Sequence, residues 1–384
     1  MKPHGVFELL RRCTIEHDWT VAPEGIEAML AGAAPRLVGK AAADHGVANL
    51  VFLSTREMPT LEPELRSLLG TVYQLNLTHH MKVIGELTAL AGTLDAAGIP
   101  FMVVKGPVLS EIVYPRNDMR SYGDLDLVID RRVFGDAVTA LLESGCDMLD
   151  RNWRVIRREL RGQVHMTARF GTSADVHWHL INRASVRGSF AIDMDELFAR
   201  ARRVSLDGPS VLTLDAEDTL IQLALHAGLS GGVKLAWLKD IERACLAPEL
   251  AWGEVVSRAH RFAAAEVVAV SLRRAQELLG AEVPPEVTAE LGGSRVWQGI
   301  VRGSERLSRA GRPPNQPSLS RAVTRATRSG LRTSLRALIA RSGDDLADHG
   351  GRLFGRGRAI LASGGDESDR MAYFEAIQSG RTAA

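Results

Sequence analysis

Residues that could do chemistry gather in one stretch, residues 101–130, with the sequence FMVVKGPVLSEIVYPRNDMRSYGDLDLVID. Two carboxylates, Asp124 and Asp126, interrupt an apolar run that otherwise has the composition of a buried strand. Side chains two residues apart on a strand point to the same face, so these carboxylates are expected to lie side by side. Neighbouring carboxylates repel unless a cation lies between them, and Mg²⁺ prefers hard oxygen ligands. The spacing therefore predicts a magnesium site.

A third carboxylate follows on a later strand-like run. Asp175 alternates with His177 and His179 in ADVHWHLI, so the three side chains are predicted to share one face. A third aspartate beside the first pair is what a two-metal phosphoryl-transfer site needs. The histidines leave a second interpretation open, in which they bind metal in a hydrolase site. We expect instead that one of them orients a carboxylate or packs beside Trp178.

Lys105, Gly106 and Pro107 supply a feature of a different kind. A glycine lets a phosphate approach the backbone closely, and a helix that begins at Pro107 presents free N–H groups. Lys105 adds a point charge. These residues predict a phosphate-binding turn beside the carboxylates. Arg120 either reaches the phosphate or braces its own loop.

The elements that must position these residues follow from hydrophobic periodicity. Strands are predicted over residues 101–104, 124–129, 154–160, 164–170 and 174–181, and helices over residues 81–97, 108–114, 131–144 and 252–279. Gly98 is expected to stop the first of these helices. Of the other aspartates, we expect Asp118, in the loop before Asp124, to be solvated and Asp240 to pair with a nearby Arg or Lys.

The composition is that of an ordinary globular protein and names no partner. The 384 residues are 45% hydrophobic and 24% charged, and the formal net charge is +1. Cys13, Cys146 and Cys245 have no short spacing, so neither a disulfide framework nor a thiolate metal cluster is expected. We find no apolar run of about 18 residues and no N-terminal signal pattern. The chain is therefore expected to be cytoplasmic.

Charge is distributed unevenly along the chain. Residues 295–360 contain 14 Arg, no Lys and four acids, a net charge of +10, so the remainder carries −9. Five of these arginines are three or four residues apart: Arg321, Arg325, Arg328, Arg332 and Arg336. On a helix, this spacing would place them in one continuous basic stripe. The stripe is either a docking surface for an anionic partner (RNA, an acidic protein or a membrane surface) or a solvated face. It contains no aromatic residue, which argues against single-strand stacking.

The run VVKGPVLSEIVYPRNDMRSYGDLDLVI resembles the uncharacterised nucleotidyltransferase family of the DNA polymerase β superfamily. The resemblance covers about residues 80–280 and includes the later runs LIQLALHAG and LAWLKDIERA. The matching motifs are Lys105 and Gly106, Tyr114 and Pro115, Arg120, Asp124 and Asp126, and then Asp175 with His177 and Trp178. One departure is the turn, where the superfamily often has Gly-Ser or Gly-Gly and this chain has Gly106 and Pro107. Pro107 donates no N–H to a phosphate.

The resemblance implies an α+β fold, with a nucleotidyltransferase-like mixed β-sheet between N-terminal and C-terminal helical regions. It also implies Mg²⁺, with two ions expected, and an NTP as donor. Four regions are expected: an N-terminal helical region (residues 1–98), a nucleotidyltransferase-like catalytic core (99–205), a helical domain (206–292) and an Arg-rich, partly disordered C-terminal region (293–384). The expected catalytic and metal-binding residues are Asp124, Asp126 and Asp175, and the expected nucleotide-binding residues are Lys105, Gly106, Arg120 and Gly123.

The leading hypothesis is transfer of an NMP from an NTP to an unidentified acceptor, with release of pyrophosphate. A non-catalytic nucleotide-binding or scaffold module of a biosynthetic cluster is one alternative. A metal-dependent phosphohydrolase that uses His177 is another.

Overall fold

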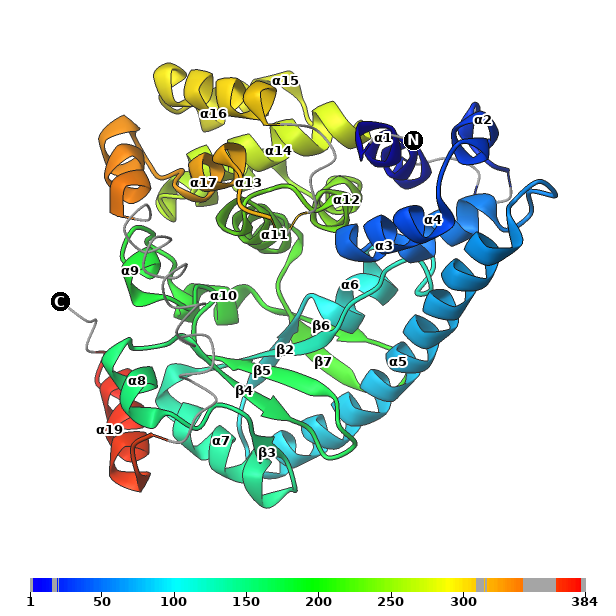
Figure 1. Cartoon of the computed structure of the whole chain (residues 1–384). Helices are drawn as coiled ribbons and strands as arrows, with labels where there is room; N and C mark the ends of the chain where they lie inside the picture. Colours follow the sequence, from blue (N-terminus) through cyan, green and yellow to red (C-terminus); the bar gives the residue numbers. More distant parts are fainter. Residues whose placement is uncertain are drawn as a thin grey trace. The chain divides into compact units, whose positions relative to one another are not determined.

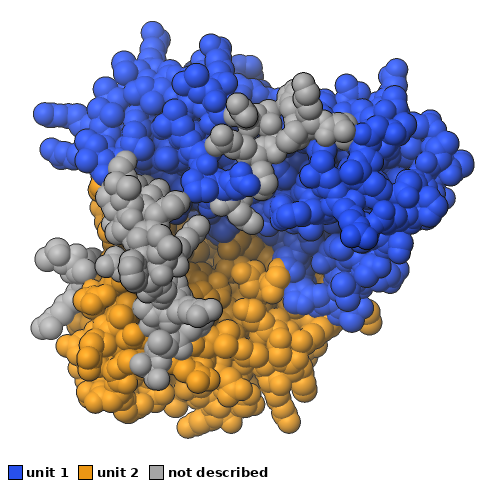
Figure 2. Space-filling model, in the orientation of Figure 1, with its two compact units in different colours: residues 1–79, 109–122, 216–339 blue, residues 80–108, 123–215, 340–384 orange. Residues whose placement is uncertain are grey.

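The computed structural model describes residues 3–15, 19, 21–308, 314, 316–340 and 364–380 (Figure 1). The chain forms two compact units (Figure 2). The helical unit contains residues 1–79, 109–122 and 216–339, and the sheet unit contains residues 80–108, 123–215 and 340–384. Each unit is therefore built from three separate segments, whereas the sequence suggested four consecutive regions.

The sheet unit is built on a seven-stranded sheet with the order β3-β4-β5-β2-β1-β7-β6. Its strands are β1 (Phe101–Val104), β2 (Asp124–Ile129), β3 (Asp147–Met148), β4 (Gln163–Thr167), β5 (Ser173–His177), β6 (Arg202–Ser205) and β7 (Ser210–Thr213). The pairs β2–β5 and β1–β7 are parallel, and the other neighbouring pairs are antiparallel. The predicted α+β fold with a mixed sheet is confirmed.

The two central strands occupy the residues predicted for them. All four residues of β1 are buried, and in β2 only Asp124 is exposed. Leu125, Leu127 and Ile129 have no exposed surface, so one face of β2 lies wholly in the core. Alternating apolar residues with β-branched members favour this arrangement.

The strand predicted over residues 154–160 is wrong, because α8 (Trp153–Arg158) is a helix there. Asn152 caps this helix by accepting a hydrogen bond from the backbone N–H of Val155. The buried residues Trp153 and Ile156 are three positions apart, which is a helical spacing. The two later predicted strands, over 164–170 and 174–181, correspond to the shorter β4 and β5.

The sheet unit also contains η1 (Arg131–Val133), α7 (Phe134–Glu143), α9 (Ala184–Arg187), α10 (Met194–Arg200) and α19 (Glu367–Gln378). Asp130 caps η1 through the N–H of Arg132. Two further helices, α5 (Pro63–Ala96) and α6 (Gly106–Ile112), belong partly to each unit. Gly98 follows α5 with φ +67°, the left-handed conformation expected of a residue that stops a helix.

The helical unit contains α1 (Pro3–Thr14), α2 (Ile26–Ala31), α3 (Pro35–His45), α4 (Ala48–Thr55), α11 (Ala216–Ser230), α12 (Leu235–Ala244), α13 (Trp252–Arg261), α14 (Ala265–Leu279), α15 (Pro285–Leu291), α16 (Arg295–Leu307) and α17 (Leu319–Arg325). Residues 331–340 are also helical. The single helix predicted over 252–279 is broken between α13 and α14, where Ala263 has φ +53°. No helix in the described parts of the chain is long and apolar enough to cross a membrane.

The basic stripe predicted from residue 321 to residue 336 is not continuous. Helix α17 ends at Arg325, and the chain leaves helical geometry before it resumes at residue 331. Arg328 is buried and donates to the backbone carbonyls of Arg325 and Thr327. Arg321 donates to the carbonyl of Pro314. Some arginines of this segment therefore bind the protein's own backbone. Residues 309–313, 315 and 341–363 of the C-terminal region lie outside the described residues.

The helix α19 closes one side of the sheet unit through aromatic contacts. Tyr373 and Phe374 pack against Phe134 and Trp153. The fully buried Tyr373 donates its hydroxyl to the carbonyl of Arg161 at 2.6 Å. This last segment of the chain therefore supplies part of the core of the sheet unit.

We expect Tyr373→Ala to lower the free energy of unfolding by about 3–5 kcal/mol, because it leaves a cavity of aromatic size. Tyr373→Phe loses two hydrogen bonds, one donated to the Arg161 carbonyl and one accepted from Trp178 Nε1, and is expected to cost about 1–2 kcal/mol. Urea unfolding measures both, with Met371→Ala as the control because Met371 lies on the same helix and is 49% exposed. Equal effects of Tyr373→Ala and Met371→Ala would contradict the docking of α19.

Candidate active site

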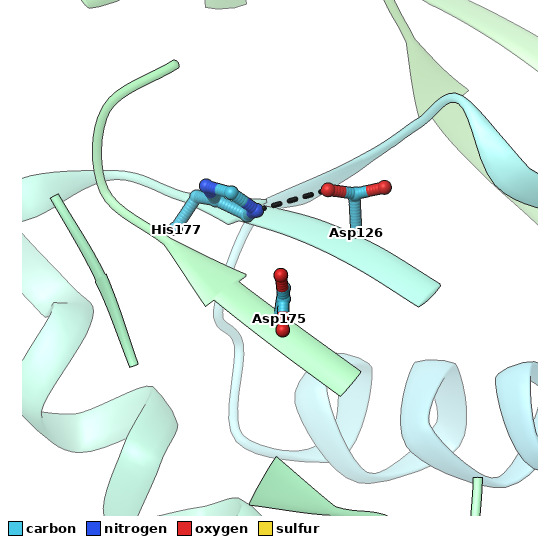
Figure 3. Close-up of side chains that lie close together, drawn as sticks. All are labelled: Asp126, Asp175 and His177. Carbon is cyan, nitrogen blue, oxygen red and sulfur yellow. Dashed lines mark hydrogen bonds and ion pairs between the residues drawn. The ribbon is translucent and has the colours of Figure 1, made fainter. Parts of the chain in front are cut away.

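Three of the predicted site residues lie on one face of the sheet because of the register between β2 and β5. These strands pair in parallel, with Asp126 opposite Asp175. Asp124 lies two residues before Asp126 and His177 two residues after Asp175, so all four side chains share a face. Figure 3 shows Asp126, Asp175 and His177 converging above these strands.

Asp126 is the centre of this cluster and is 3% exposed. Its Oδ1 atom accepts from Lys105 Nζ at 2.9 Å and lies 3.0 Å from His177 Nε2. As expected, a histidine therefore contacts a carboxylate, while His179 packs against Trp178. The charge of Lys105 and the contact with His177 both favour the ionised form of this buried carboxylate.

The backbone of the Lys-Gly turn is held in an unusual conformation. Lys105 has φ +59° and Gly106 has φ +46°, so two consecutive residues are left-handed. For a residue with a side chain this conformation costs roughly 1–2 kcal/mol, and such strain is concentrated at functional sites. The turn places the Lys105 ammonium on Asp126, at the edge of the carboxylate cluster.

The two buried aspartates have opposite pKa shifts. Burial alone would raise the pKa of Asp126, but the charge of Lys105 and the contacts with His177 outweigh burial and lower it well below its usual range. Burial raises the pKa of Asp175, and the charges of Asp126 and Asp124 raise it further against the opposing effect of His165 and His177. A carboxylate with a raised pKa beside an ionised one is the arrangement expected of an acid–base pair.

Sequence reasoning missed the residues of β4 that hold Asp175. Gln163 Nε2 donates to Asp175 Oδ2 at 2.9 Å and lies 3.0 Å from His165 Nε2. His165 Nδ1 lies 2.8 Å from Asp150 Oδ2, a contact that raises the pKa of His165 against the effect of burial. A chain of contacts thus runs from the buried Asp150 to Asp175. In the sequence, Gln163 and His165 show only the alternation of a strand. That alternation does not place them beside Asp175 unless β4 is known to pair with β5.

The two carboxylates of the donor set suit a hard divalent cation, whereas the imidazole is a ligand that transition metals prefer. Asp126, Asp175 and His177 each offer one ligand atom, and these atoms lie within 4.8 Å of one another. Asp124 lies on the same face but is exposed and stands outside this group. A metal at Asp126 Oδ1 would compete with the ammonium of Lys105 and with His177, which both contact that oxygen.

Arg120, predicted to bind nucleotide or to brace its loop, lies in the helical unit with a nearly buried side chain. Its Nε and Nη2 atoms donate to the two oxygens of Asp240 at 2.8 and 3.0 Å, and Tyr114 donates to the same carboxylate at 2.8 Å. The expected pairing of Asp240 is confirmed. These contacts are those of a residue that braces its loop. Nucleotide binding by Arg120 stays a prediction.

Asp118 was expected to be solvated, and this expectation is wrong. The residue is 8% exposed and accepts a hydrogen bond from Tyr73 at 2.6 Å. It also forms an ion pair with Arg116, and its backbone carbonyl accepts from Asn49. Asp118 therefore joins α4 and α5 to the loop that precedes Asp124.

The opposite pKa shifts predict opposite stability effects of two similar substitutions. The lowered pKa of Asp126 means that its ionised form stabilises the fold above the unfolded pKa of about 3.9, and that this stabilisation is lost as the pH falls toward the folded value. The raised pKa of Asp175 means that the stability contributed by its protonated form is present below about pH 3.9 and is lost as the pH rises above that value through the folded pKa. With a chelator at pH 7.5, Asp126→Asn should lower the free energy of unfolding by about 3 kcal/mol, and Asp175→Asn should raise it.

Urea unfolding at pH 7.5 and at pH 3 measures both effects. Both differences from the parent protein should shrink at the lower pH. A loss of stability in both variants at pH 7.5 would contradict the assigned charge states.

Comparison with known proteins supplies the class of this site. No curated protein and no solved structure matches the chain. The model of one protein family, described as uncharacterised nucleotidyltransferase, matches residues 31–280 and so covers all the strands and site residues described above. The predicted family and enzyme class are confirmed, and the chain belongs to the uncharacterised nucleotidyltransferase family.

Proposed function

We propose that this protein is a Mg²⁺-dependent nucleotidyltransferase that transfers an NMP from an NTP to an acceptor hydroxyl and releases pyrophosphate. The observation that carries the proposal is the parallel register that sets Asp126 beside Asp175, with Asp124 on the same face. Membership of the nucleotidyltransferase family supports a nucleotide as substrate.

In this proposal Asp124, Asp126 and Asp175 hold two Mg²⁺ ions, and His177 orients Asp126. Bound Mg²⁺ would neutralise phosphate charge and lower the pKa of the acceptor hydroxyl. Lys105 and Gly106 hold the β- and γ-phosphates. A Cβ atom on Gly123 would meet nothing within 4 Å, which leaves room for substrate next to Asp124.

Asp175 is the proposed proton acceptor. Its raised pKa makes it a better base than the strongly paired Asp126. Gln163 donates to its Oδ2 atom at 2.9 Å, whereas Oδ1 has a longer contact of 3.6 Å with His165 Nε2, so Oδ1 is the proposed acceptor of the hydroxyl proton. The deprotonated oxygen bonds to the α-phosphorus, the bond from that phosphorus to the bridging oxygen breaks, and pyrophosphate leaves.

Calorimetric titration with each of the four NTPs, with and without Mg²⁺, tests the proposal before any acceptor is known. We expect Mg²⁺-dependent binding of at least one NTP, and we expect Asp124→Asn and Asp126→Asn to abolish it because the metal ligands are lost. Asp147→Asn is the matched control, because Asp147 is an exposed aspartate on β3 and should bind as the parent does. Unchanged NTP binding in both site variants would refute the assignment.

Lys105→Met tests whether Lys105 contacts the outer phosphates. A charge-assisted hydrogen bond contributes about 1.5–3 kcal/mol, so NTP binding should weaken by about 10- to 100-fold. NMP binding should change little, because NMP lacks those phosphates. Calorimetry with both nucleotides distinguishes this role from a purely structural one, in which the variant would affect NTP and NMP alike.

One contact favours a second candidate. His177 lies within ligand distance of the carboxylates, so the cluster also resembles a mixed Asp/His site of a metal-dependent phosphohydrolase. The products separate the two functions. A nucleotidyltransferase releases pyrophosphate in an acceptor-dependent reaction, whereas the hydrolase releases phosphate from NTP without an acceptor.

A further inference from the structure

Only part of the apolar face of α16 is buried in the protein, and the rest is exposed. Trp297 and Val301 are fully buried in the core of the helical unit. On the neighbouring side of the helix, Val296, Ile300 and Leu307 are 60%, 36% and 78% exposed. Their spacings of four and seven place them in one line along the helix. This line of aliphatic side chains faces solvent.

A row of arginines runs beside this aliphatic line. Arg295, Arg302 and Arg306 are exposed, and their spacings of seven and four form a second line along α16. Among the described residues, no carboxylate pairs with any of the three. The one acid of the helix, Glu305, is held by Arg273 and Arg274. The outer side of α16 is therefore cationic along one edge and aliphatic along the other.

The helical residues 331–340 have the same two features. Leu335 and Ile339 are 39% and 73% exposed, and Arg332 and Arg336 are exposed beside them. The inner side of this helix packs through Leu331 and its neighbours against the cluster that contains Trp297. Both helices thus border one small core and expose aliphatic and arginine side chains outward.

We propose that α16 and residues 331–340 form a surface that binds the anionic headgroup region of a phospholipid membrane. Arginines along the edge of an aliphatic face are characteristic of helices that lie in this interface. The arginines would contact lipid phosphates while Val296, Ile300 and Leu307 enter the acyl boundary. The surface lies beyond residues 31–280, which match the family, so family membership does not imply it.

Other occupants fit the chemistry less well. Protein interfaces are enriched in aromatic anchors, and single-stranded nucleic acid is bound by aromatic stacking. Both outer faces lack an aromatic side chain among their exposed residues. Self-association would bring Arg295, Arg302 and Arg306 of two copies together without a counter-charge. A membrane surface offers lipid phosphates to the line of arginines and acyl chains to the line of aliphatic side chains.

Vesicle sedimentation of the full chain tests the proposal. The probes are vesicles of phosphatidylcholine with phosphatidylglycerol and vesicles of phosphatidylcholine alone. We expect binding to the anionic vesicles that weakens as NaCl is raised, and much weaker binding to the neutral ones. Arg302→Gln/Arg306→Gln should weaken anionic binding by about thirtyfold, and Ile300→Ser/Leu307→Ser should weaken it as well.

Matched controls are Arg151→Gln and Leu75→Ser, which change an exposed arginine and a 63% exposed leucine elsewhere. Both should bind as the parent does, and thermal unfolding should show that all variants remain folded. No vesicle binding, equal binding to both vesicle types, or binding insensitive to the α16 variants would each overturn the proposal. Retention of polyuridylate without vesicle binding would assign the surface to nucleic acid and overturn it too.

Discussion

The ionised carboxylate of Asp126 needs a cation, and the local structure of the sheet unit provides one. An unpaired charge at this depth would cost several kcal/mol. The strained turn at Lys105 costs less, so the fold gains by accepting a left-handed lysine that reaches Asp126. Asp175 has no lysine beside it in the described part of the chain, and burial, with a smaller contribution from the charges of Asp126 and Asp124, raises its pKa. The chain therefore keeps a carboxylate where ionisation is unfavourable, which is characteristic of catalytic sites.

The local part of this arrangement could be predicted from the sequence, and the part that depends on strand pairing could not. Alternation with apolar residues located β2 at the residues it occupies and set Asp124 and Asp126 on one face. The neighbourhood of Asp175 depends on which strands pair and in what register. The contact of Gln163 with Asp175 could not be predicted, because it depends on the antiparallel pairing of β4 with β5.

Periodicity misled where tertiary contacts decide the backbone. The arginine spacing from residue 321 onward fits one helix, yet Arg328 is buried and binds backbone carbonyls at the point where α17 has already ended. Residues 154–160 alternate as a strand does, but the Asn152 cap and the aromatic contacts of Trp153 with α19 favour a helix. Asp118 lies in a loop, as expected, but it is buried because Tyr73, far earlier in the chain, lies beside it.

The division of each unit into three segments has a consequence for synthesis on the ribosome. The chain passes from one unit to the other five times, so neither unit is a contiguous stretch that can fold as it emerges. The aromatic surface of Phe134 and Trp153 stays uncovered until α19, near the end of the chain, has been made. Contacts between residues this far apart slow folding and prolong the exposure of apolar surface. Because the segments of the two units alternate along the chain, the units cannot be separated by cutting at a single site.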